Sequence, residues 1–493
     1  MAFGVGLKYQ QFNCSNGCLC GNPEQWAGVL SRRKFLAVSA ATPMLLTASE
    51  SSGATAQSSD EAAAASKSRI PPGLSKAIAA AIDADADRLV GIYKDIHQHP
   101  ELGFMEVRTS DIIAKQLKAL GFEVTIGIGK TGVVGALRNG EGPTLMYRAD
   151  MDANAVEEAT GLPFASRVRV QRDDGTEAPV AHMCGHDAHV TWMLGMARAM
   201  ASAKDAWSGT LILVGQPAEE LILGARAMVD DGLYSRRLVP VPDHLVALHT
   251  APIPTGVVAA RGGTIMAGTD QIDVTFHGIG GHGSMPQLTK DPVIMGSMAV
   301  VQYQMILSRV LNPLDTAVLT VGSFQAGSDN NVIPENALLK LNLRFFDLKV
   351  RDQMIAGVKT INDGIGTTYG MPEERMPAMV MKGFSPPLVN TESLVEKLKP
   401  ALREMLGERN VATEFPPATG SEDVHILKGD NPNVEMAFIA VGIADPALFT
   451  EDLIKARRLP FSPHNPDFRV DLAAIPLGAR IATLSVMELM VKA

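Results

Sequence analysis

Residues 182–189 read HMCGHDAH, and five of these eight side chains can bind a metal ion or transfer a proton. Cys184 and His186 flank a single glycine, so a tight turn would bring a thiolate and an imidazole close enough to hold one ion. Residues 188–200 then place apolar side chains at helical spacing, which predicts a buried helix behind the turn. A turn mounted on a buried helix is a rigid support for a metal site, and we expect the fold to be organised around it. The alternative is a loop that happens to be rich in histidine.

Short apolar strands and amphipathic helices alternate on both sides of this stretch, which predicts an α/β fold with helices on both faces of a sheet. The expected helices are residues 74–96 and 110–120, and the expected strands are residues 122–126, 132–137, 144–148, 210–215 and 246–249. The strand at 144–148 leads into Asp150 and Asp152, at the carboxyl end where such sheets place their ligands. Two aspartates at the end of a strand are also common in ordinary turns, so this pair alone does not decide between a ligand-binding site and a structural turn.

The pattern changes between residues 269 and 377. Strands are expected at 271–276, 317–324 and 338–345, helices at 292–310 and 350–368, and a further strand after them. The order β-α-β-β-α-β is that of a ferredoxin-like module. Because the α/β pattern resumes near residue 381, the module is predicted to be an insertion: a larger domain formed by residues 74–265 and 382–493 carries a smaller one at 266–381.

Charge and composition limit the partners. Lys and Arg number 44 against 53 Asp and Glu, a formal net charge of −9, and no basic stripe is present. Neither nucleic acid nor an anionic membrane is therefore an expected partner.

The first 56 residues have the pattern of an export signal. SRRKFL at residues 31–36 precedes an apolar run at 37–48, and ATA at 54–56 has the form of a cleavage site. The apolar run is much shorter than the ~20 residues that span a bilayer, so no stable membrane anchor is expected. The pattern resembles a twin-arginine signal. It predicts that the twin-arginine translocase exports the folded protein to the periplasm or beyond, with residues 57–73 as a flexible linker.

Cysteine placement bears on the metal prediction. Cys14, Cys18 and Cys20 precede the expected cleavage point, which leaves Cys184 alone in the mature chain. A chain with one cysteine forms no internal disulfide, so Cys184 is either a buried apolar residue or a ligand.

Metal-binding side chains recur at four separate strand ends or turns. They are Cys184 with His186, the pair Glu219–Glu220, His249, and His464 near the C-terminus. This mixture of sulfur, nitrogen and oxygen suits zinc or a neighbouring divalent ion, and there are enough donors for two ions. Adjacent residues at a strand end point in different directions, so one glutamate could bind metal while the other acts as a base. A solvated acidic pair is the alternative.

Seven short motifs resemble, in the same order, those of the aminoacylase/carboxypeptidase-type metallohydrolases, especially amidohydrolases similar to hippurate hydrolase and to the plant auxin-conjugate hydrolases. They are RADMDA (148–153), HMCGHDAH (182–189), GQPAEE (215–220), LHT (248–250), GGHGSMP (280–286), NVIP (331–334) and GSED (420–423). The resemblance covers the chain from about residue 89 to its end. It implies a metallopeptidase-like catalytic domain with a mixed sheet and an inserted ferredoxin-like dimerisation domain.

The resemblance also assigns roles. It implies two divalent ions per subunit (zinc first, with manganese, cobalt or nickel as alternatives) held by Cys184, His186, Glu220, His249 and His464. Glu219 would be the general base, and Asp152 would orient a ligand. In relatives the small domain forms a homodimer, in which His282 would reach the partner's site to stabilise the oxyanion. Asn331 and Arg344 match positions that hold the substrate's carboxylate.

The implied activity is metal-dependent hydrolysis of N-acyl amino acids. Leu221, Ile222 and Leu223 stand where relatives have small residues, which favours hydrophobic acyl or aryl groups. A dipeptidase or carboxypeptidase on the same scaffold is the alternative enzyme. A metal- or ligand-binding protein without turnover is the alternative from another class, and the presence of Glu219 argues against it.

Overall fold

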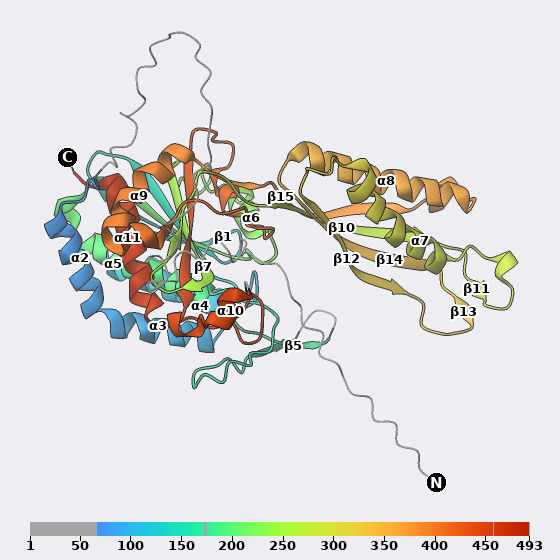
Figure 1. Ribbon diagram of the computed structural model, residues 1–493, viewed down its shortest axis with the longest axis horizontal. Coiled ribbons are helices and arrows are strands. Elements are labelled where there is room, and N and C mark those ends of the chain that lie inside the picture. The colour runs from blue at the N-terminus through green and yellow to red at the C-terminus, as the bar shows by residue number, and fades with distance from the viewer. Residues whose placement is uncertain (1–66, 172–174, 457, 493) are drawn as a thin grey trace, which may run out of the picture.

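The computed structural model describes residues 67–171, 175–456 and 458–492, which form two domains side by side (Figure 1). The expected export signal, with Cys14, Cys18 and Cys20, lies outside the described residues. The first described helix, α2 (Pro72–Ala84), begins within the segment expected to be linker and has Pro72 at its first position, where a proline needs no hydrogen bond.

Within the described residues, the larger domain contains an eight-stranded mixed sheet. Strand β3 pairs in parallel with β6 and β7, while β1 and β2 continue the sheet antiparallel beyond β6. In spatial order the strands are β1 (Glu123–Ile128), β2 (Gly132–Asn139), β6 (Gly209–Gln216), β3 (Thr144–Asp150), β7 (His244–Pro254), β18 (Glu435–Ala444), β8 (Val258–Ala259) and β17 (Val411–Ala412).

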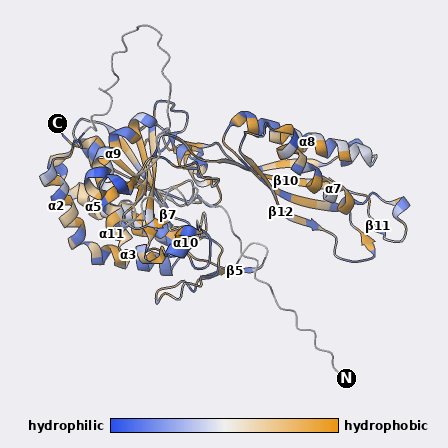
Figure 2. Cartoon of the chain, viewed as in Figure 1, coloured by the Kyte–Doolittle hydropathy of each residue, from blue (hydrophilic) through white to orange (hydrophobic). Residues whose placement is uncertain are grey.

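Alternate residues of the central strands enter two different hydrophobic cores, as the period of two requires. On β3, Leu145 and Tyr147 join one core and Met146 joins the other. Hydrophobic residues accordingly run through the middle of the large sheet (Figure 2). Helices line both cores: α2, α3 (Ala86–Gln98), α4 (Val107–Ala119), α5 (His186–Ser202), α9 (Glu392–Leu406) and α11 (Ala474–Met490) on one face, and α6 (Gly224–Asp230) on the other. The predicted fold class is confirmed.

Helix α5 is buried along almost its whole length and packs against α11. The two helices approach closely because residue 478 is a glycine: a Cβ there would lie 2.2 Å from the Trp192 ring. Trp192 is fully buried, and its indole nitrogen donates a hydrogen bond to the carbonyl of Ala474. The metal-binding motif at the start of α5 therefore rests on a rigid support.

The smaller domain has the predicted β-α-β-β-α-β order. Its sheet runs β12-β14-β10-β15, and two helices cover one face. The elements are β10 (Gly268–His277), α7 (Pro292–Met305, extended by a π-helical turn at Ile306–Val310), β12 (Ala317–Ala326), β14 (Asn336–Phe345), α8 (Leu348–Thr368) and β15 (Ala378–Ser385). This is the ferredoxin-like arrangement, with β15 continuing past the expected boundary at residue 381.

The helix expected over residues 74–96 is in fact two helices, because the chain breaks at Asp85, whose φ and ψ are −98° and 0°. Asp85 accepts hydrogen bonds from Arg88 in the first turn of α3, which stabilises the break. The remaining described strands and the remaining described α-helix are short: β4 (Arg169–Gln171) with β5 (Glu177–Pro179), β9 (Gly263–Met266) with β16 (Leu388–Asn390), β11 (Gly281–His282) with β13 (Val332–Ile333), and α10 (Glu451–Lys455).

Candidate functional site

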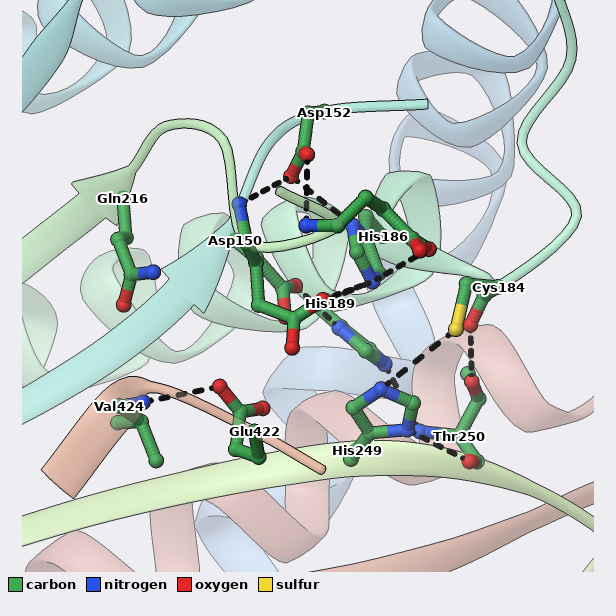
Figure 3. Close-up of polar contacts among 12 residues, drawn as sticks. Asp150, Asp152, Cys184, His186, His189, Gln216, His249, Thr250, Glu422 and Val424 are labelled. Carbon is green, nitrogen blue, oxygen red and sulfur yellow. Dashed lines mark hydrogen bonds and ion pairs between the residues drawn. The ribbon is translucent and has the colours of Figure 1, made fainter. Parts of the chain in front are cut away.

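The polar side chains singled out by the sequence gather at one edge of the large sheet. Asp150 ends β3 and Gln216 ends the parallel strand β6, so the loops that follow, carrying Asp152 and Glu219, begin beside each other. This is the edge at which open α/β sheets bind ligands. Figure 3 shows the side chains of Asp150, His186, His189 and His249 converging above the strands.

Short distances link the five expected metal ligands into one cluster. Donor atoms of Cys184, His186 and Glu220 all lie within 4.8 Å of each other. The Cys184 Sγ atom is 3.8 Å from His249 Nε2, and His464 Nε2 is 3.2 Å from Glu220 Oε1. Ligand atoms at about 2.0–2.3 Å from one ion lie roughly 3–4.5 Å apart, which is the spacing found here.

The turn that presents Cys184 and His186 depends on the glycine between them. Gly185 has φ 84°, and a Cβ there would lie 2.7 Å from the Thr250 side chain. The Thr250 hydroxyl donates a hydrogen bond to the carbonyl of Cys184, at 2.5 Å. The strand β7, which carries His249, therefore fixes the turn as well.

Two histidines of the cluster have different hydrogen-bonding states. The His249 Nδ1 atom lies 2.8 Å from the carbonyl oxygen of Thr250, which can only accept, so Nδ1 carries the proton and the Nε2 lone pair is left for an ion. His189 accepts a hydrogen bond at Nε2 from the Thr250 amide (2.8 Å), and its Nδ1 lies 2.5 Å from Asp150 Oδ1. Both nitrogens of His189 are thus occupied by the protein, so it positions Asp150 and is not a ligand.

His186 and the surrounding carboxylates fit a divalent cation. Both ring nitrogens of His186 are buried without a hydrogen-bond partner of acceptable geometry. Burial lowers the pKa of His186, but the charges of Asp150 and Asp152 outweigh it and raise the pKa to about 10. A cationic group is therefore strongly favoured at this point, and a metal ion would supply that charge in place of the proton.

The Glu219–Glu220 pair sits on a turn held by Asp152. The carboxylate of Asp152 accepts hydrogen bonds from the amides of Glu219 (3.1 Å) and Glu220 (3.0 Å), and it lies 3.4 Å from His186 Nδ1. Burial, followed by the charges of Glu422 and Glu220, raises the pKa of Glu219 well above its usual range. A carboxylate with a raised pKa is suited to accept and return a proton.

Arg148 forms a buried network behind the cluster. It is fully buried, and its guanidinium donates to Asp150 Oδ2 (2.6 Å), to both oxygens of Glu422 (2.7 and 3.1 Å) and to Gln216 Oε1 (2.8 Å). Gln216 in turn donates to Asp423, whose pKa is raised to about 8 by burial and by the charge of Glu422. Arg148 thus fixes the carboxylates that surround His186 and Glu219.

The remaining expected site residues are divided between two places. Arg344 on β14 donates to the hydroxyl of Ser421 (2.6 Å), directly before Glu422, so it faces the larger domain. His282 on β11 and Asn331 lie together, since His282 pairs with Val332 on β13 and the Gly283 amide donates to the Asn331 carbonyl (2.7 Å). Figure 1 places β11 at the far end of the small domain, so within one chain His282 is remote from Cys184.

Several residues of the site had no role in the sequence-based prediction. Arg148, Gln216 and Glu422 were part of quoted motifs, and only Arg148, a charged residue within an apolar strand, gave a local signal. Glu106, whose carboxylate accepts a hydrogen bond from the Ala218 amide (2.8 Å), gave none, because Ala218 is 112 residues away in the chain. His182 begins the HMCGHDAH motif, and neither of its ring nitrogens has a hydrogen-bond partner among the described residues.

Comparison with known proteins gives consistent matches. A model of peptidase family M20/M25/M40 matches residues 146–487. An IAA-amino acid hydrolase of Arabidopsis thaliana is 34% identical over 415 residues, covering 82% of this chain and 87% of that protein. A hippurate hydrolase of Campylobacter jejuni is 35% identical over 334 residues, covering 67% and 82%. The crystal structure of a dinuclear metal binding peptidase of the M20 family from Bacillus subtilis superimposes with a TM-score of 0.63 at 25% identity, covering 83% of this chain and 99% of that one.

Proposed function

Because the chain belongs to peptidase family M20/M25/M40 and is a hydrolase of the metal-dependent amidohydrolase type, we propose that it cleaves the amide bond of N-acyl amino acids with hydrophobic acyl or aryl groups. The observation that carries the proposal is the meeting of Cys184, His186, Glu220, His249 and His464 beside a separate buried carboxylate, Glu219.

We assign two divalent ions to these five ligands, with zinc as the first choice because sulfur and nitrogen donors are mixed with oxygen. Bound there, the ions would lower the pKa of a water molecule and polarise the amide carbonyl. Glu219, whose Oε2 lies 3.8 Å from His186 Nε2, takes the proton from the attacking water and returns it to the departing amine. Asp152 keeps the Glu219–Glu220 turn and the His186 ring in place for this transfer.

The preference for an apolar acyl group rests on the residues that follow the base. Leu221 and Leu223 are 43% and 39% exposed, although large apolar side chains are usually buried. Chains similar to this one include a hippurate hydrolase and an IAA-amino acid hydrolase. Arg344, held against Ser421 at the domain junction, is the residue we assign to the carboxylate of the amino acid.

Hydrolysis of N-benzoylglycine, an N-succinyl amino acid and a free dipeptide, each with and without chelator, tests this proposal. We expect chelator-sensitive turnover that is fastest on the benzoyl substrate. A higher kcat/KM on the dipeptide would favour the dipeptidase reading, and faster cleavage of the charged succinyl group would refute the acyl preference. Leu221→Ala should lower kcat/KM on the benzoyl substrate more than on the succinyl one.

We also propose a homodimer formed by the small domain. Ile294, Met298, Val301 and Met305 repeat at intervals of four and three residues along α7 and are 48%, 39%, 70% and 54% exposed, an apolar stripe that a second copy would cover. Dimerisation would also explain why His282 and Asn331 lie far from Cys184 within one chain, because both could then reach the site of the partner subunit. Light scattering should give twice the subunit mass, and Val301→Lys should give a monomer; a monomeric parent protein would refute this proposal.

The location is a further proposal: export to the periplasm by the twin-arginine translocase, supported by SRRKFL at residues 31–36 and ATA at 54–56. Cell fractionation of the full chain and of an Arg32→Lys/Arg33→Lys variant tests it. Export of both forms, or of neither, would contradict the proposal.

A further inference from the structure

Glu106 is a carboxylate with no exposed surface that reaches the turn before the Glu219–Glu220 pair. Its Oε1 accepts hydrogen bonds from the amides of Ala218 (2.8 Å) and Phe104 (2.9 Å), and its Oε2 accepts one from the Thr131 hydroxyl (2.5 Å). One side chain therefore joins three loops that are far apart in the sequence.

The amides of three consecutive residues on that turn donate to buried carboxylates. Ala218 donates to Glu106, while Glu219 and Glu220 donate to Asp152. With three amides held from two sides, the directions in which the Glu219 and Glu220 side chains leave the backbone are fixed. The Asp152 half of this arrangement also touches the ligand His186, whereas Glu106 touches no expected ligand through its side chain.

The turn is held in a backbone conformation that it would not adopt by itself. Ala218 has φ 47° and Ile222 has φ 56°, left-handed values that are unfavourable for residues other than glycine. Phe104, a second partner of Glu106, has φ 65°, and Lys130, next to Thr131, has φ 85°. Such strain persists only where surrounding contacts impose it, and it concentrates at functional sites. The carboxylate of Glu106 is the contact that these loops share.

We propose that Glu106 is a positioning residue for the Glu219–Glu220 turn: by holding the Ala218 amide it keeps the general base and the metal-binding carboxylate pointing in their separate directions. This rests on the proposed function for the role of Glu219, but the effect on ion binding follows from geometry alone. Loss of a residue that orients a ligand typically costs ~10–100-fold in metal affinity or activity.

Two substitutions at this position separate positioning from charge. In Glu106→Gln the amide oxygen can still accept from Ala218 and Phe104, and the amide nitrogen can donate to the Thr131 hydroxyl. We expect this variant to keep kcat and ion affinity within about threefold of the parent. In Glu106→Ala every one of these hydrogen bonds is lost. We expect kcat to fall ~10–100-fold and ion affinity to fall in the same range, with KM changed much less.

Glu101 provides a matched control. Its carboxylate also accepts three hydrogen bonds, from the amides of Arg108 and Thr109 and from the Thr109 hydroxyl. Both donor residues belong to helix α4, and neither lies on the Glu219–Glu220 turn. Glu101→Ala should lower the thermal midpoint while leaving kcat and ion affinity unchanged. Thermal melts, steady-state kinetics and calorimetric titration of chelator-treated protein with Zn²⁺ alone are measured on all variants.

The outcomes are distinct. A folded Glu106→Ala variant that matches Glu101→Ala, with parent values of kcat and ion affinity, would overturn the proposal. If Glu106→Ala does not fold, Thr131→Val, which removes one anchor of the carboxylate, decides the question: reduced kcat and ion affinity support positioning, and parent values refute it. If the parent protein binds Zn²⁺ but cleaves no amide, the proposed function fails, and the Zn²⁺ titrations still test the role of Glu106.

Discussion

Replacing Arg148 with methionine is expected to destabilise the larger domain strongly. The guanidinium is the partner of two fully buried carboxylates, Asp150 at 2.6 Å and Glu422 at 2.7 Å, and it also donates to Gln216. Methionine fills much of the same volume without the charge, so both carboxylates would remain buried without their cation. Removing one partner of a buried pair typically costs about 3–5 kcal/mol, so we expect a loss of that size in the free energy of unfolding. Arg148→Lys keeps the positive charge but loses the bidentate hydrogen bonding of the guanidinium. Its free energy of unfolding should therefore lie between those of the parent and of Arg148→Met.

Urea unfolding followed by tryptophan fluorescence measures this loss, because Trp192 and Trp207 are both buried in the larger domain. Arg88→Met is the control: Arg88 also binds an aspartate, Asp85, but the pair is partly exposed, and such pairs contribute about 0–1 kcal/mol. The reasoning is refuted if Arg148→Met costs no more than Arg88→Met.

Two further predictions concern stability. His97 is buried between Asp187 (2.6 Å) and Glu158 (3.2 Å); burial lowers its pKa, but these hydrogen bonds outweigh it and raise the pKa to about 9. Since the pKa of His97 is higher in the folded than in the unfolded state, protonated His97 stabilises the folded state. This stabilisation is complete below about pH 6.5 and disappears as the pH rises to about 9. The free energy of unfolding should therefore fall by up to roughly 3 kcal/mol over that range, and His97→Gln should flatten this part of the pH profile. Gly478→Ala should lower the thermal midpoint, because its Cβ would lie 2.2 Å from Trp192 and overpacking costs about 1–3 kcal/mol; an unchanged midpoint would show that α5 and α11 separate easily.

The sequence predicted those parts of the fold and site whose signal is local. The ferredoxin-like module could be predicted because each strand alternates and each helix has its own period, and Cys184 and His186 stood out because ligands are dense around them. His249 and His464 were candidate donors from their places at a strand end and in a loop, but a single histidine there is weak evidence, and the family resemblance was needed to assign both as ligands.

The features that escaped prediction depend on distant contacts. Arg148 and Glu422 are 274 residues apart, and nothing local indicates that they pair. Glu106 is an ordinary acidic residue in the sequence, and only the fold brings Ala218 to it. The break at Asp85 was missed because no proline or glycine marks it. Backbone strain at Ala218 is likewise a property of the assembled loops.

The most direct test of the central claim is the turnover of Glu219→Gln after loading with metal. If five other side chains serve as the ligands and Glu219 moves the proton, this variant should bind two ions per subunit like the parent, while its kcat falls ~10²–10⁴-fold, the usual contribution of a general base. A loaded variant that retains a tenth or more of the parent kcat, or one that no longer binds the ions, would contradict the account.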